Sequence, residues 1–233
     1  MSQRDGAGGS IAGGSGPVAV LFDLDGTLVD SEPVWDQALR RLARELGGEL
    51  SDPARRATVG TNVPVSVEIV RVDVGRPDAE PVVLAERLVA DVRERLAAGL
   101  RWRPGARELL DAVRAAGIPT ALVTNTERDL VRIALGPLVE ELFDASVCGD
   151  EVRRSKPDPE PYLTAAALLG VDPARAVAIE DSPAGAASAE AAGCPVLVVP
   201  ADVPVPPGPR RSFVASLADV GVTDLARLVR RAA

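Results

Sequence analysis

Val18-Ala-Val-Leu-Phe-Asp-Leu-Asp-Gly-Thr-Leu-Val-Asp-Ser31 opens with five apolar residues and then becomes acidic. A short apolar run bounded in this way predicts a buried strand, which places Asp23 and Asp25 at its carboxyl end. In open α/β sheets, ligands bind outside these strand ends. Two carboxylates followed by Gly26 therefore indicate a point that could hold a divalent cation. The alternative is a strand that simply ends in an Asx-type turn.

Further apolar segments, separated by helical patterns, predict a parallel sheet with right-handed crossovers. The expected strands are 18–22, 118–123, 145–148, 176–179 and 195–199. The expected helices between and after them are 104–116, 127–135, 160–169, 182–192 and 223–231. Thr223 is expected to cap the last helix.

Residues 32–99 carry helical patterns alone, expected at about 32–46, in a short helix that starts at Ser51-Asp52-Pro53, and at about 64–74 and 81–98. A change from alternating strand and helix to helix alone indicates a helical subdomain inserted into an α/β domain. We therefore expect a core formed by 17–31 and 100–233, with the insertion at 32–99. The glycine-rich residues 1–16 are expected to form a flexible tail.

The composition restricts the chemistry and the partners. The net charge of -8 over 233 residues argues against nucleic acid and anionic membranes, and no apolar stretch is long enough to span a bilayer. A small anionic substrate stays possible, because a bound metal can reverse the local field. The chain has no histidine, which excludes histidine as base or metal ligand. Cys148 and Cys194 lack metal-ligand spacing and indicate a reducing, cytoplasmic location.

Polar residues occur where four predicted strands end or shortly after them. They are Asp23 with Asp25, Thr124 with Asn125, Lys156, and Glu180 with Asp181. Lys156 is the single lysine among 26 lysines and arginines. Each has an ordinary explanation, namely a helix cap, a surface lysine or a helix N-terminus. Together on one sheet edge they supply the components of Mg²⁺-assisted phosphoryl transfer, which are oxygen ligands, a cation and neutral donors.

These motifs resemble those of the haloacid dehalogenase superfamily, in particular its phosphatases. Asp23-Leu24-Asp25-Gly26-Thr27 matches the first motif and Thr124-Asn125 resembles the second. Lys156-Pro157-Asp158-Pro159 matches the third, and Glu180-Asp181-Ser182 with Gly185 matches the fourth. The resemblance covers roughly residues 18–225 and implies a Rossmann-like three-layer core with a helical cap. The cap resembles that of phosphoglycolate phosphatases, sugar-phosphate phosphatases and β-phosphoglucomutase.

The resemblance also implies roles for the strand-end residues. Asp23 would be the nucleophile, and Asp25 would protonate the leaving oxygen and then activate water. Mg²⁺ would be held by Asp23, the backbone carbonyl of Asp25 and Asp181, with Glu180 as a direct or water-mediated ligand. Lys156 would offset the charge of Asp23 and of the phosphate.

Phosphate binding is expected from Thr124, together with Lys156 and the backbone of Asn125 and Gly26. In the cap, Glu32 is expected to contact substrate. Other cap residues that could face the site are Trp35, Asn62 and Arg71.

The leading hypothesis is a Mg²⁺-dependent phosphatase that acts on a small phosphorylated metabolite, as a monomer or homodimer. Asp25 argues against a dehalogenase, which needs no acid there, and the cap has no lysine for phosphonatase chemistry. A second hypothesis is a phosphomutase, which would need cap cations for a bisphosphate, with Arg55, Arg56, Arg71 and Arg76 as candidates. A third is an inactive binding protein.

Overall fold

The computed structural model describes residues 17–136 and 138–232, so the tail expected at 1–16 lies outside the described residues. Its centre is a six-stranded, fully parallel sheet in the order β3-β2-β1-β4-β5-β6. The strands are β1 (Ala19–Phe22), β2 (Thr120–Val123), β3 (Ala145–Val147), β4 (Ala176–Glu180), β5 (Val196–Val198) and β6 (Arg211–Phe213).

Helices cover both faces of this sheet, because successive side chains of each strand point to opposite sides. On one face, Phe22 packs in a cluster with Leu110 and Leu225, and on the other Leu21 packs with Tyr162 and Ala186. The core helices are α5 (Ala106–Ala115), α6 (Arg128–Leu135), α7 (Leu138–Leu142), α8 (Glu160–Leu169), α9 (Pro183–Ala191) and α10 (Val222–Ala232). The predicted three-layer α/β core is confirmed.

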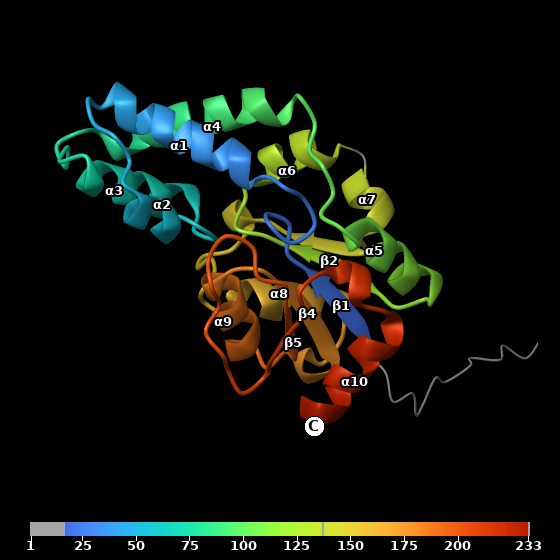
Figure 1. The fold of residues 1–233 in the computed structure, drawn as a ribbon. Coiled ribbons are helices and arrows are strands. Elements are labelled where there is room, and N and C mark those ends of the chain that lie inside the picture. The colour runs from blue at the N-terminus through green and yellow to red at the C-terminus, as the bar shows by residue number, and fades with distance from the viewer. Residues whose placement is uncertain (1–16, 137, 233) are drawn as a thin grey trace, which may run out of the picture.

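Four helices form a separate group beside the carboxyl ends of the strands (Figure 1). They are α1 (Glu32–Glu45), α2 (Asp52–Ala57), α3 (Val63–Asp73) and α4 (Pro81–Leu96). Leu39, Val67 and Leu88 pack into their own apolar cluster, which Leu130 of α6 joins from the core. The predicted helical cap is therefore confirmed, whereas the domain limits at 32 and 99 stay a prediction. Within the described part of the chain, no helix is both long and apolar enough to cross a membrane.

Three features differ from the expectations. β6 was not predicted, because Arg211–Phe213 is a short, partly exposed edge strand after a proline-rich loop and has no apolar run. The short helix α7 was also not predicted. Thr223 does not cap α10, which begins at Val222 and leaves Thr223 within its first turn. Single 3₁₀ turns complete the core at Gly149–Glu151, Pro173–Arg175 and Leu217–Asp219.

Candidate active site

The predicted strand-end residues meet because β1 lies between β2 and β4. Leu21 of β1 pairs with Ala121 on one side and with Ala178 on the other. From β1 the sheet continues through β2 and β3 on one side and through β4, β5 and β6 on the other. The strand order therefore reverses at β1, which is where ligands bind in such sheets. The N–H of Asp23 donates to the Ile179 carbonyl (3.0 Å), which aligns the end of β1 with that of β4.

Lys156 connects the ends of β1, β2 and β4 through its ammonium group. Its Nζ lies 2.6 Å from Asp23 Oδ1, 2.6 Å from Glu180 Oε1 and 2.8 Å from the Val123 carbonyl. All three N–H bonds therefore have acceptors. The side chain is 2% exposed, so these contacts replace water entirely. Lys156 is therefore not a solvated surface lysine, which was the alternative interpretation of this residue.

The site carries more buried negative charge than Lys156 can balance. Burial raises the pKa of Asp23 to about 8; Lys156 opposes this shift, and the charges of Glu180 and Asp25 add to it. Burial, followed by the charges of Asp23 and Glu180, raises the pKa of Asp181 well above its usual value. Burial alone would lower the pKa of Lys156, but Asp23 and Glu180 outweigh it and keep the ammonium charged. Such an excess of carboxylate favours a bound cation.

The carboxylates of Asp23, Glu180 and Asp181 fit a hard divalent cation such as Mg²⁺. They offer oxygen atoms within 4.8 Å of one another. Asp23 Oδ2 and Asp181 Oδ2 are buried and have no hydrogen-bond partner, as expected of ligand atoms. Gly26 makes room here, because a β-carbon at this position would overlap the Asp181 carboxylate.

Glu180 has other partners in addition. Its Oε1 accepts from Lys156 and from the hydroxyl of Tyr162 (2.6 Å), and its Oε2 accepts from Ser182 (3.3 Å). These contacts hold Lys156 in place and leave Glu180 less free than Asp181 to bind a cation. Its role as a metal ligand, like that of the Asp25 carbonyl, stays a prediction. Tyr162 gave no signal in the sequence, because a single tyrosine on an apolar helix is typical of core packing.

Asp25 has a different environment from Asp23, since all its side-chain partners are neutral. Oδ1 accepts from Ser31 Oγ (2.6 Å) and Trp35 Nε1 (3.2 Å). Oδ2 accepts from Thr126 Oγ1 (2.7 Å) and Thr124 Oγ1 (3.3 Å). Ser31 and Thr126 were not predicted, although Ser31 belongs to the motif region. The carboxylate of Asp25 thus joins the start of the cap to the end of β2.

The expected phosphate ligands lie in the site, with most of their hydrogen-bonding groups engaged. Thr124 donates to Asp25, and the Asn125 amide donates to the carbonyls of Gly60 (2.9 Å) and Lys156 (3.2 Å). The N–H of Gly26 donates to the carbonyl of Val29 (2.9 Å). Their contacts with phosphate stay predictions, and the structure adds a contact between Asn125 and the cap at Gly60.

Cap and core together enclose a cavity of about 40 Å³, called the catalytic cavity below. Its core side includes Asp23, Asp25, Thr124, Asn125, Thr126, Lys156, Asp181 and Ser182, and its cap side includes Glu32, Trp35, Leu39, Arg55, Thr58, Gly60, Thr61 and Ser66. Glu32 and Trp35 therefore reach the site, as the sequence led us to expect. Thr61 and Ser66 were missed, because helical periodicity gives the face of a helix but not its partner.

Two of the suggested cap residues lie elsewhere. Asn62 accepts from the N–H of Val65 as the cap of α3, and its amide donates to Ser155 Oγ (2.7 Å) on the core. Arg71 contacts the carboxylate of Glu68 and the carbonyl of Pro77. Neither side chain lines the catalytic cavity, because a nearer partner holds each of them.

The arginines suggested for a bisphosphate are also engaged or distant. Arg76 pairs with Asp78 (3.1 Å), and Arg56 lines an outer groove next to the cap. Arg55 alone reaches the catalytic cavity, where it pairs with Glu32 (2.5 Å). Arg55, the one of these four that lines the catalytic cavity, therefore already has a carboxylate partner, and the arrangement gives the mutase hypothesis no unpaired arginine at this site.

The family model described as haloacid dehalogenase-like hydrolase matches residues 18–193. Hexitol phosphatase A of Escherichia coli K12 is 36% identical over 189 residues, which cover 79% of this chain and 84% of that protein. A plasmid-encoded phosphoglycolate phosphatase of Cupriavidus necator is 37% identical over 212 residues, covering 86% and 88%.

Among solved structures, CbbY from Rhodobacter sphaeroides in complex with phosphate superposes with a TM-score of 0.74 at 27% identity. The match covers 88% of this chain and 96% of that one. The family model covers the cap and all four polar strand-end motifs, which the fold brings to one edge of the sheet. The chain belongs to the haloacid dehalogenase-like hydrolase family.

Proposed function

We propose that this chain is a Mg²⁺-dependent phosphatase that hydrolyses a small phosphorylated metabolite, a sugar phosphate or a phosphoglycolate-like ester, through an aspartyl-phosphate at Asp23. The observation that carries the proposal is the buried contact between Lys156 and Asp23 at 2.6 Å, next to the unpartnered oxygens of Asp23 and Asp181. A buried nucleophilic carboxylate with a cation beside it and space for a metal suits attack on an anionic ester.

The reaction needs two displacements at phosphorus. Asp23 attacks, the bond from phosphorus to the ester oxygen breaks, and Asp25 gives a proton to the leaving oxygen. Asp25 then takes a proton from water, which attacks phosphorus, releases phosphate and frees Asp23. Lys156 balances charge on Asp23 throughout, and the Thr124 hydroxyl, which donates to Asp25 in this structure, would turn to donate to a phosphoryl oxygen. Mg²⁺ held by Asp23 and Asp181 would supply positive charge to the phosphoryl oxygens.

The size of the catalytic cavity supports a movement of the cap during turnover. About 40 Å³ holds one or a few water molecules and is too small for a sugar phosphate. Contacts of Asn125 with Gly60 and of Asn62 with Ser155 join cap and core, and both must break when substrate enters. Closure would then exclude water during the first displacement.

A substrate panel with Asp23→Asn as the key variant tests the proposal. We expect Mg²⁺-dependent phosphate release from sugar phosphates and p-nitrophenyl phosphate, and a loss of about 10⁴-fold or more in the variant. Asp111→Asn is the control, because Asp111 is an exposed aspartate of α5 that lines neither the catalytic cavity nor the outer groove. Release that survives Asp23→Asn, or that needs no divalent cation, would refute the proposal.

The location and assembly of the protein are part of the same proposal. Cys148 and Cys194 are both buried and free, which supports a reducing compartment such as the cytoplasm. Small phosphorylated metabolites are its expected partners, and nucleic acid and membranes are not. Both a monomer and a homodimer are compatible with a site built from one chain.

A further inference from the structure

The cap side of the catalytic cavity restricts what the leaving group can be. We infer that it selects phosphate monoesters whose leaving group is uncharged and carries hydroxyl groups, and that it disfavours leaving groups with a carboxylate or a second phosphate. This inference rests on the proposed function and narrows its substrate class to sugar phosphates, because the leaving group of a phosphoglycolate-like ester carries a carboxylate. Its basis is the direction of the hydrogen bonds that cap residues already make.

Arg55 is the positive group on the cap side, and its charge is already neutralised. Its Nη2 donates to Glu32 Oε2 (2.5 Å) and the Glu32 carbonyl (3.4 Å), and its Nε donates to Asp36 (3.0 Å). Its Nη1 donates to Thr58 Oγ1 (3.2 Å). Four of the five N–H bonds of the guanidinium therefore have protein acceptors. A second anionic group on the substrate would have to displace a buried carboxylate to reach Arg55.

Thr61 and Ser66 present acceptors rather than donors to the cavity. The hydroxyl of Thr61 donates to the carbonyl of Thr58 (2.9 Å), which uses its single hydrogen. The contact of 2.8 Å between Thr61 Oγ1 and Ser66 Oγ must then use the hydrogen of Ser66. Both oxygens keep free lone pairs, which can accept from a substrate hydroxyl but not pair with a substrate carboxylate.

Glu32 adds more acceptor capacity next to these hydroxyls. A carboxylate offers about four lone-pair positions, and the contact with Arg55 uses one of them. Substrate hydroxyl groups can supply the hydrogens that Glu32, Thr61 and Ser66 lack. An anionic leaving group would instead bring further acceptors into a closed, buried site, where unpaired acceptors are costly.

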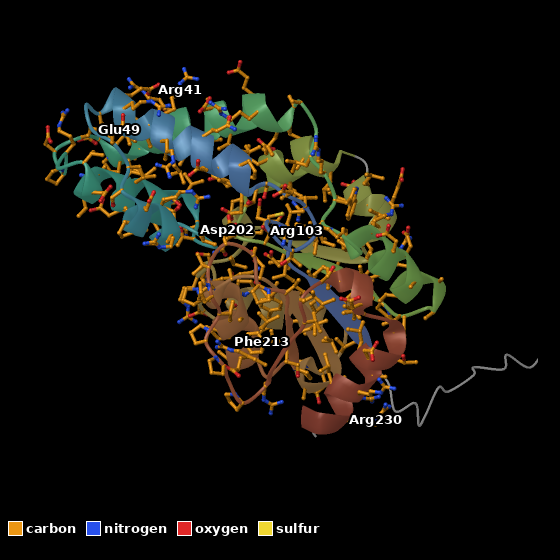
Figure 2. All side chains as sticks on the ribbon, viewed as in Figure 1. Arg41, Glu49, Arg103, Asp202, Phe213 and Arg230 are labelled. Atoms are coloured by element: carbon orange, nitrogen blue, oxygen red, sulfur yellow. The ribbon has the colours of Figure 1, made fainter. Side chains whose placement is uncertain are left out.

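The charged side chains of the outer groove, which lies beyond the pair of Glu32 and Arg55, are mostly negative. Glu32 and Arg55 line both this groove and the catalytic cavity, so the two spaces adjoin. The other charged groups of the groove are Asp30, Asp36, Arg56 and Asp202. Figure 2 shows Asp202 between the cap and the core. Three aspartates against one arginine disfavour an anionic extension of the substrate here as well.

Glucitol 6-phosphate and 6-phosphogluconate test the inference, because they differ only at C1, which is a hydroxymethyl group in one and a carboxylate in the other. We expect a kcat/KM at least about 100-fold higher for glucitol 6-phosphate. In Glu32→Gln, the charge of Arg55 is no longer neutralised from within the cavity, so this preference should fall at least about tenfold. Glu45→Gln is the matched control: this α1 carboxylate pairs with Arg41 on the outer side of the cap (Figure 2) and should leave the ratio unchanged.

Equal or reversed preference in the wild-type protein, or a ratio that Glu32→Gln leaves unchanged, would overturn the inference. Ser66→Ala provides a second variant should Glu32→Gln fail to fold. It should raise the KM for glucitol 6-phosphate about tenfold and leave the KM for p-nitrophenyl phosphate, which has no hydroxyl on its leaving group, unchanged. An unchanged KM for glucitol 6-phosphate would also overturn the inference. Absence of phosphate release from every ester, p-nitrophenyl phosphate included, would instead refute the proposed function.

Discussion

Replacing Gly26 by alanine should weaken Mg²⁺ binding in addition to lowering the stability of the fold. Gly26 has φ +81°, and a β-carbon there would overlap the Asp181 carboxylate. The positive φ costs about 1–2 kcal/mol in stability for alanine. The displaced carboxylate adds a loss of about 10–100-fold in metal affinity, as found when the support of metal ligands is disturbed.

Gly47→Ala separates the two effects. Gly47 has φ +87°, and a β-carbon there would meet no atom within 4 Å. Both variants should therefore lose similar backbone stability, whereas Gly26→Ala alone should change the metal site. The pair isolates the contact with Asp181 from the backbone strain.

Thermal unfolding with and without Mg²⁺, together with a Mg²⁺ titration of phosphatase activity, measures the difference. At a Mg²⁺ concentration of 100 times the wild-type Kd, binding stabilises the wild-type protein by about 2.7 kcal/mol. A Kd raised 100-fold reduces this gain to about 0.4 kcal/mol at the same concentration. The reasoning fails if Gly26→Ala keeps the wild-type Mg²⁺ dependence, or if Gly47→Ala shifts it equally.

Three further predictions follow from the buried charges and the cap contacts. Lys156→Met should lower the free energy of unfolding by about 3–5 kcal/mol in urea, because Asp23 and Glu180 lose the ammonium between them; a loss below about 1 kcal/mol would contradict this. Without Mg²⁺, stability should fall as the pH rises from about 4 to 8, because burial raises the pKa of Asp23 to about 8 and the native state keeps a proton that the unfolded chain has lost. Urea midpoints at pH 5 and pH 8 measure this, and equal midpoints would count against it. Asn62→Ala should lower the free energy of unfolding by about 0.5–2 kcal/mol, because α3 loses its N-terminal capping residue. The same change removes the hydrogen bond to Ser155 and should ease opening of the cap domain, so stopped-flow measurements should show faster substrate binding. Wild-type binding kinetics would show that the contact with Ser155 does not hold the cap domain closed.

The core of the site was predictable from the sequence for a specific reason. Asp23, Thr124 and Asp181 each follow a buried apolar strand, and the parallel sheet brings the carboxyl ends of such strands to one edge. The position of Lys156 followed from its rarity and its motif rather than from any strand. The positions of polar residues directly after predicted strands were therefore enough to predict the core side of the site.

The cap half could not be predicted in the same way. Thr61 and Ser66 meet across the turn that begins α3, and Arg55 meets Glu32 because α2 packs near the start of α1. These contacts depend on how helices pack, which periodicity does not specify. Arg71 has the same residue type as Arg55 and lies on a neighbouring helix, yet it contacts Glu68 instead. Residue type and approximate position therefore cannot decide which cap arginine reaches the substrate.

The two aspartates of the first motif also show how one intervening residue separates their roles. Leu24 is buried in the apolar core between them, so Asp23 and Asp25 face different surroundings. Asp23 contacts the ammonium of Lys156, which favours the ionised form that a nucleophile requires. Among the described residues, Asp25 instead contacts hydroxyl and indole groups, and none of these side-chain partners is charged. Because Ser31 and Trp35 at the start of the cap supply half of these contacts, opening the cap should change the hydrogen bonds of Asp25, whereas Lys156, which contacts Asp23, belongs to the core.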